Sequence, residues 1–449
     1  METLYQTTVV IKRLRDYFQP YLCLLTKPSG HKAFLLILAL LTMQFATSIN
    51  NLYKWFLARA GKTSLNAYYY LLNETAIPMD KFFAITVRLA MSLLPSELNG
   101  LPVFLIIDDT LQEKFGTKFA CYQTMFDHAK HNGTNYLKGH CFVALTICIP
   151  VIIEQEIKYL NVPVGYRLRG KDENKLKMAS EMIDLVMDVL AEYPMVVLLC
   201  DSWYPKGKII ETVKKHTNLE LISNVRVDTA MFEPKPERTG KPGRPRERGK
   251  KLNIHMDFSF IKVGDYFIGV KTVLTNLFEH LPIYATVTTP DLLKHDTYRV
   301  FICTVTPHAL QQQFKGCEKN LSSSLNAHVL WLLPLFLYSY RWAIEVMFYE
   351  QKKFWSFGLY RLRSKAGIEN FVNFASLSYA CMKILPLMDD RFSSLASESP
   401  QSCKYIIGDA VRNEIFLLHF GSNPETALYS HLIFNSPVES TPCSLPHPA

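Results

Sequence analysis

The stretch LPVFLIIDDT, residues 101–110, is a short apolar run that ends in acidic residues. Such a run is typical of a strand buried inside a sheet. A second stretch, MVVLLCD at residues 195–201, has the same pattern and ends at Asp201. If the two strands are neighbours, Asp108 and Asp201 stand side by side at the edge of the sheet. The alternative is that each acid only caps a turn or a helix.

The segments around these two runs predict the rest of a mixed sheet. Apolar runs that begin at His140, Lys158 and Leu219 predict three further strands. Helical periodicity predicts amphipathic helices that begin at Asn174 and Lys206. The resulting order is three strands, a helix, a strand, a helix and a strand. This order is typical of an α/β sheet with helices on its faces.

Composition places the chain among folded proteins. Its 449 residues are 49% hydrophobic and 20% charged, and the net charge of +9 weakly favours a polyanionic partner. The ten cysteines form no CxxC pair, so we expect free thiols in a reducing compartment and no zinc site. The apolar run from Ala33 is about five residues short of a membrane span, and we expect a buried helix there. We therefore predict a cytoplasmic protein that does not enter a membrane.

Changes in pattern along the chain suggest several parts. We expect an N-terminal helical domain at 1–97, the first part of the α/β domain at 98–227, a β-rich insertion at 228–325, the last part of the α/β domain at 326–390, and a C-terminal helix with a disordered tail at 391–449. The insertion contains a basic, proline-rich arm at 233–251, which cannot bury apolar surface. We expect this arm to be exposed.

A third acid stands beyond the two strands. Two carboxylates side by side repel each other unless a cation lies between them, and oxygen ligands suit Mg²⁺ or Mn²⁺ rather than zinc. The stretch YSYRWAIEVMFYEQKKFWSF, read as one helix, places four polar residues on a narrow stripe: Tyr338, Arg341, Glu345 and Lys352. Glu345 either completes a metal cage with the two strand acids or forms a surface ion pair with Arg341 or Lys352.

These three segments resemble the signature of DDE transposases of bacterial insertion sequences. The last segment is similar to the subgroup motif Tyr-x2-Arg-x3-Glu-x6-Lys at every spacing. IIDDT resembles the first acidic motif, which places a ligand at Asp108 with Asp109 as the alternative. LLCDSWYPKG resembles the second motif, with Asp201 as the ligand. The resemblance covers roughly residues 100–375.

The resemblance implies a ribonuclease-H-like fold with a β-rich insertion before the last acid. It also implies that Asp108, Asp201 and Glu345 hold two Mg²⁺ (or Mn²⁺) ions and are the catalytic residues of a DNA transposase. Such an endonuclease cuts double-stranded DNA at the inverted ends of its element and then joins the freed 3′-hydroxyl to target DNA. We expect a homodimer in the DNA complex and a nucleoid-associated location in the cytoplasm.

Residues beside the acids are expected to contact DNA. The resemblance implies that Arg341 and Lys352 hold phosphates on either side of the cut. Tyr338 is expected to contact the DNA backbone as well. Trp203 follows the second acid by two positions. It is either a stacking platform for an extruded base or a residue of the core.

The basic arm and the N-terminal helices are further candidates for DNA contact. Arg244 and Arg246 lie in a Gly-Arg-Pro-Arg sequence that resembles the core of an AT-hook, which binds the A·T minor groove. A basic loop that contacts phosphates without base preference is the interpretation we favour. The helices at 1–97 either bind DNA ends or only pack against the rest of the chain.

Two other classes of protein remain as alternatives. One is a catalytically decayed or domesticated sequence-specific DNA-binding protein, and the intact spacing of all three motifs argues against it. The other is a ribonuclease-H-like nuclease of another type, such as a junction resolvase. The long β-rich insertion and the polar stripe argue against that class.

Overall fold

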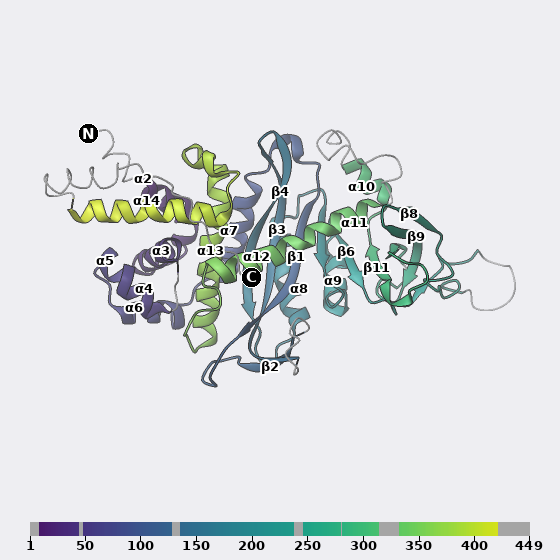
Figure 1. Cartoon of the computed structure of the whole chain (residues 1–449), viewed down its shortest axis with the longest axis horizontal. Coiled ribbons are helices and arrows are strands. Elements are labelled where there is room, and N and C mark those ends of the chain that lie inside the picture. The colour runs from purple at the N-terminus through teal and green to yellow at the C-terminus, as the bar shows by residue number, and fades with distance from the viewer. Residues whose placement is uncertain are drawn as a thin grey trace, which may run out of the picture.

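The computed structural model describes residues 9–44, 48–127, 135–237, 246–279, 281–313 and 332–420. Within these ranges one sheet of eleven strands runs through the middle of the molecule, and many of the helices gather at one end (Figure 1). Five strands form the centre of the sheet, in the order β4-β3-β1-β5-β6. They are β1 (Val103–Glu113), β3 (Tyr136–Ile153), β4 (Glu156–Leu168), β5 (Val196–Cys200) and β6 (Leu219–Val225).

β1 and β5 contain the two apolar runs that end in acids, and they pair in parallel. The residues of 103–107 and 196–200 are all buried, as expected for strands covered on both faces. β3 pairs antiparallel with β1 on one side and with β4 on the other. The predicted mixed α/β sheet, with a ribonuclease-H-like strand order and helices around it, is therefore confirmed.

The strand that carries the first acids is longer than predicted. β1 continues past Asp108 as far as Glu113, so the acids lie inside the strand rather than at its end. The extension exists because β3 is long enough to pair with β1 up to Glu113↔Gly139. The parallel pairing with β5, however, ends at Ile107↔Cys200. Asp108 therefore lies at the point where β1 is no longer paired with β5.

The strands of the β-rich segment extend the same sheet beyond β6. β11 (Arg299–Cys303) pairs antiparallel with β6, and β10 (Ile283–Thr289) and β9 (Tyr266–Thr275) follow it outward. The short strands β7 (Met231–Phe232) and β8 (Phe260–Val263) both pair with β9. Beside β3 lies β2 (Gln123–Phe126), which the sequence did not predict. The sheet thus connects the insertion directly to the strand that follows the second acid.

The N-terminal helices pack with the two long C-terminal helices at one end of the molecule (Figure 1). The bounds are α2 (Val9–Leu22), α3 (Lys27–Thr42), α4 (Ile49–Leu52), the π-helical turn η1 (Tyr53–Leu57), α5 (Ala58–Ala60), α6 (Leu65–Asn73), α7 (Met79–Met91), α13 (Lys365–Met388) and α14 (Pro400–Phe420). The apolar run from Ala33 lies in α3 and is buried, as predicted. α13 is long and apolar enough to cross a membrane, but 83% of its most apolar window is buried inside the protein.

The remaining helices lie along the sheet. They are α8 (Lys175–Val189), α9 (Gly207–Lys215), α10 (Pro307–Gln313), α11 (Leu333–Tyr338) and α12 (Trp342–Phe354), with short 3₁₀ turns η2 (Ser96–Leu98), η3 (His295–Thr297), η5 (Ser339–Arg341) and η6 (Asp390–Leu395). The stretch from Tyr338 is not one uniform α-helix, because η5 separates α11 from α12. α12 crosses the sheet and contacts β1 and β4 (Figure 1).

Two further predictions concern thiols and the chain end. The cysteines within the described ranges are free, and most of them are buried, as the scattered spacing predicted. The tail from 421 to 449 lies outside the described residues, so its disorder stays a prediction.

Candidate active site

Asp108 and Asp201 come together where β1 and β5 part. Each directly follows the last parallel pair, Ile107↔Cys200, on its own strand. Burial, and then the negative charge of Asp201, raise the pKa of Asp108 to about 7. Burial also raises the pKa of Asp201. The chain therefore holds two carboxyl groups close together in a place that provides too little positive charge for both.

Arg341 connects the strand acid to the helix acid. One guanidinium nitrogen, Nη1, lies 3.1 Å from Oδ2 of Asp108, and the other, Nη2, forms an ion pair with Oε1 of Glu345. The side chains of Arg341 and Asp108 are each only 16% exposed. Because Arg341 and Glu345 are four residues apart, both reach the sheet from the same face of the helix. The predicted ion pair between these two residues exists, and it also includes the first acid.

Asp109 takes part in a different cluster. Its carboxylate lies 2.8 Å from Nζ of Lys175 at the start of α8 and accepts a hydrogen bond of 3.1 Å from the hydroxyl of Tyr204. Successive side chains of a strand point to opposite faces, so the two neighbouring acids separate toward α12 and toward α8. The sequence left the choice between them open. The geometry places Asp108, and not Asp109, in contact with Arg341.

Trp203 lies beside the second acid with its ring partly in solvent. Its backbone N–H donates to Oδ1 of Asp201 at 3.0 Å, and its side chain belongs to the exposed large hydrophobics at 37%. Nζ of Lys175 lies 4.0 Å from the ring centroid and Nζ of Lys206 lies 5.2 Å from it. The exposed ring is not a plain core residue. Its two cationic neighbours also suit a phosphate near the ring.

The two ends of the polar stripe fasten the helices to the sheet. The ring of Tyr338 packs edge-on against Phe301 of β11, with centroids 5.1 Å apart. Nζ of Lys352 donates a hydrogen bond of 3.0 Å to the backbone oxygen of Leu111 in β1. α12 therefore follows β1 from Asp108 onward. Both residues were predicted to contact DNA, and in the free protein they contact the chain itself.

The remaining predicted DNA contacts belong to the basic arm. Arg246 is exposed, and Arg244 lies outside the described residues.

The site also contains two residues that the sequence did not point to, Lys175 and Tyr204. Both belong to the environment of Asp109, which is far from Lys175 in sequence, so no local spacing could have revealed the contact.

The donor chemistry of the three acids fits Mg²⁺ or Mn²⁺. Carboxylates from β1, from directly after β5 and from α12 offer the oxygen atoms that these ions prefer, and burial, then the charge of Asp201, raises the pKa of Asp108. Over the part of the chain that the structure describes, no three acid, thiol or imidazole groups are gathered tightly enough to hold one ion. In this conformation the cation between Asp108 and Glu345 is the guanidinium of Arg341.

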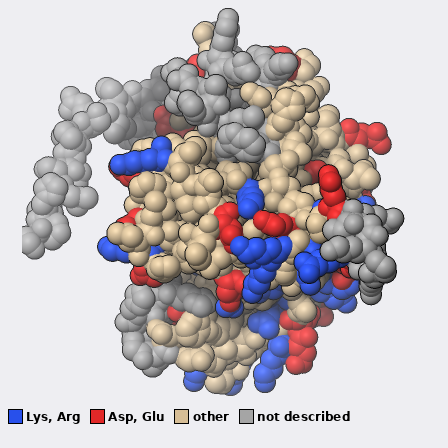
Figure 2. Space-filling view, turned by 90° about the vertical axis from the view of Figure 1, so that its right-hand side faces the viewer, with Lys and Arg blue, Asp and Glu red and all other residues tan. Residues whose placement is uncertain are grey.

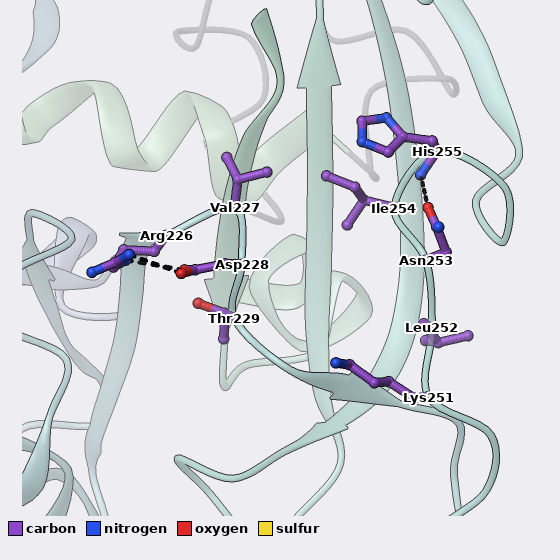
Figure 3. Close-up of a pocket in the computed structure, with 9 residues that line it drawn as sticks. All are labelled: Arg226, Val227, Asp228, Thr229, Lys251, Leu252, Asn253, Ile254 and His255. Atoms are coloured by element: carbon purple, nitrogen blue, oxygen red, sulfur yellow. Dashed lines mark hydrogen bonds and ion pairs between the residues drawn. The ribbon is translucent and has the colours of Figure 1, made fainter. Parts of the chain in front are cut away.

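A separate hollow of about 800 Å³ lies in the β-rich part of the sheet, between the segments 226–229 and 251–255 (Figure 3). The guanidinium of Arg226 points at Asp228 and pairs with it at 2.8 Å. Lysines and arginines lie beside aspartates and glutamates over this end of the molecule (Figure 2). Lys250 pairs with Asp257 in the same way. Much of the positive charge here is thus already neutralised.

The strand order is that of a ribonuclease-H-like fold, and acids stand on β1 and directly after β5. A family model described as DDE superfamily endonuclease matches residues 20–259, more than half of the chain. The chain therefore belongs to the DDE superfamily endonucleases. The matched residues include Asp108 and Asp201 and end before Glu345. No curated protein matches the chain in sequence.

Proposed function

We propose that this endonuclease is a DNA transposase. It cuts double-stranded DNA at the inverted ends of its element and joins the freed 3′-hydroxyl to target DNA, as a homodimer. The observation that carries the proposal is that Arg341 links Asp108 to Glu345 at the point where β1 and β5 part, where Asp201 also stands. In the proposal these carboxylates hold Mg²⁺ or Mn²⁺, with two ions as the expected number.

The chemistry of the proposal divides between the ions and the chain. Bound divalent ions supply Lewis acidity toward the phosphodiester and a water molecule that loses its proton more easily. Arg341 presents a planar fork of N–H donors that matches a phosphate as well as a carboxylate, so it exchanges its carboxylate partners for the DNA backbone. Lys352, whose ammonium group contacts Leu111 further along β1, provides a second phosphate contact. Trp203 provides a ring on which an extruded base stacks.

The test is cleavage of a duplex that carries the DNA flanking the reading frame, in the presence of Mg²⁺ or Mn²⁺. We expect Asp201→Asn and Asp108→Asn to abolish cutting while leaving duplex binding intact, because each removes a ligand without changing the shape of the side chain. Asp109→Asn is the matched control on the same strand and should retain cutting. If Asp201→Asn cuts normally, or if only Asp109→Asn is inactive, the assignment of the site is wrong.

One observation favours a second candidate function, a DNA-binding protein without catalysis. Arg341 already pairs with both Asp108 and Glu345, and the described residues contain no ready set of three metal ligands. In that case the duplex binds with the same affinity in EDTA and in Mn²⁺, and neither ion produces nicks. The transposase proposal predicts metal-dependent nicking by the wild-type chain and none by Asp201→Asn.

A further inference from the structure

A second hollow, of about 860 Å³, lies next to the candidate active site. It is enclosed by the turn that follows β1 and by the segment that follows α12, residues 112–119 and 358–363. We call it the β1–α12 hollow. The hydrogen bond from Lys352 to Leu111 lies between the hollow and Asp108. The chain that carries β1 and the chain that carries α12 therefore border first the candidate active site and then the hollow. The path from Asp108 along β1 and α12 therefore leads to this hollow.

The lining of the β1–α12 hollow is strongly basic. Its charged side chains are Glu113 and four cations: Lys114, Lys118, Arg361 and Arg363. Lys118, Arg361 and Arg363 are exposed, and none of the three forms an ion pair with another described residue. This contrasts with the hollow of Figure 3, where Asp228 neutralises Arg226. Clustered cations without carboxylate partners attract a polyanion.

Lys114 connects the two sides of the hollow. Its ammonium group is buried, donates to the backbone oxygen of Tyr360 at 2.8 Å and to that of Gly358, and lies 3.5 Å from the centroid of the Tyr360 ring. Burial, and then the positive charge of Arg361, lower the pKa of Lys114 to about 8. These contacts join the turn after β1 to the segment after α12. The hollow is therefore a built feature and not a gap between loose loops.

An aromatic ring stands at the rim of the same hollow. Phe115 is 87% exposed, and the next residue, Gly116, has a φ of +103°, a turn conformation that glycine adopts easily. A phenylalanine this exposed contributes little to the core, so its packing does not explain its place. Rings of this kind in basic grooves stack on nucleic-acid bases. A base in a duplex is already stacked on both sides, so the matching partner is an unpaired base.

We propose that the β1–α12 hollow binds an unpaired nucleotide of the DNA strand that leads away from the cut. Arg361, Arg363 and Lys118 contact its phosphates, and Phe115 stacks on its base. The inference deepens the proposed function and rests on it for the identity of the substrate. It adds a binding site to one side of the catalytic acids, and it predicts that the enzyme prefers DNA that is unpaired there.

The experiment measures binding of the full chain to a short single-stranded oligodeoxynucleotide that contains 2-aminopurine, in EDTA so that nothing is cut. Stacking quenches the fluorescence of this base. We expect Phe115→Leu to lose most of the quenching and about ten-fold in affinity, while Phe115→Trp retains both. The Leu and Trp variants form a matched pair because both remain apolar and only one keeps a ring.

The phosphate contacts are tested with the double variant Arg361→Gln/Arg363→Gln. Its affinity should fall, and the slope of log affinity against log salt should flatten by about 0.7 for each lost contact to a single strand. Arg391→Gln, an exposed arginine on η6, is the control and should bind like the wild type. Unchanged quenching in Phe115→Leu, or an unchanged slope in the double variant, would overturn the proposal.

The outcome is independent of catalysis. The oligonucleotide experiment is done in EDTA, and none of Asp108, Asp201 and Glu345 lines the hollow. If the duplex is never cut but the oligonucleotide is quenched through Phe115, the transposase proposal fails and the nucleotide site stands. If the duplex is cut but Phe115→Leu behaves like the wild type in the fluorescence experiment, the nucleotide site fails and the transposase proposal stands.

Discussion

Arg341 occupies the position of a counter-ion between two acids that come from different elements. Asp108 belongs to β1 and Glu345 to α12, and the guanidinium reaches both. A buried carboxylate that loses its partner is costly, and here the nearby Asp201 increases the cost. Arg341 therefore stabilises the protein, and under the proposed function it competes with a metal ion for the same carboxylates.

This competition gives a prediction for Arg341→Gln. Without metal, we expect the variant to lose about 1–3 kcal/mol of unfolding free energy, because Asp108 is left without its charged partner. With Mn²⁺, its melting temperature should rise by more than that of the wild type, because an ion that binds only the folded state stabilises it. Thermal melting with and without Mn²⁺ measures both effects.

Lys175→Gln is the matched control for this experiment. It removes a similarly buried ion pair from the neighbouring Asp109, which does not contact Arg341. It should destabilise the protein without increasing the rise caused by Mn²⁺. An Arg341→Gln variant whose Mn²⁺ response equals that of Lys175→Gln would show that Arg341 does not occupy a metal position.

At the scale of elements, the N-terminal helices are fitted closely to the sheet. Gly165 in β4 faces Phe83 in α7, and a Cβ at Gly165 would lie 1.9 Å from the phenylalanine ring. Arg167, two residues along β4, lies over the same ring at 4.9 Å. The helix therefore rests on the strand at a place where only hydrogen fits. This contact is one of the places that join the N-terminal helices to the sheet.

Gly165→Ala should consequently destabilise the protein by about 1–3 kcal/mol, as overpacking of a tight contact does. Combining it with Phe83→Leu should recover part of that loss, because the smaller side chain leaves room for the methyl group. Gly100→Ala, where a Cβ meets nothing within 4 Å, is the control and should stay close to the wild type. Urea unfolding provides the free energies, and additive losses in the double variant would argue against the contact.

The elements that the sequence predicted are those with strong local patterns. The apolar runs of β1 and β5 and the periodicity of α8 and α9 are local properties, so they could be recognised without a structure. Three features depend on partners distant in sequence and could not be recognised in this way. β3 extends β1 past Asp108, β11 adds the insertion to β6, and the 3₁₀ turn η5 interrupts the predicted helix before Trp342.

The same distinction applies to the candidate site. Strand patterns and helix periodicity made Asp108, Asp201 and Glu345 candidates, and the resemblance to the transposase motifs then assigned them, with Arg341, to one site. The choice between Asp108 and Asp109 was not visible in the sequence, since it depends on which face of β1 meets α8 and which meets α12. The β1–α12 hollow was also invisible, because its two sides are far apart in the chain.

At the scale of the whole molecule, the site depends on parts of the chain that the family match only partly includes. Asp108 and Asp201 fall within residues 20–259, whereas Glu345 lies on α12, after the insertion strands, and is linked to Asp108 by Arg341. The joined sheet, from β1 through β6 to β11, fixes the position from which α11 and α12 return across it. The central claim is that this path delivers a third ligand to one metal site.

Cleavage of the polypeptide by bound iron tests that claim most directly. Fe²⁺ placed in the site, with ascorbate and peroxide, produces hydroxyl radicals that cut the chain close to the ion. We predict cuts near residues 108, 201 and 345 in the wild-type chain, suppressed by excess Mg²⁺ and absent from Asp201→Asn. Cuts near 108 and 201 without any near 345, or a pattern that Asp201→Asn leaves unchanged, would contradict the account.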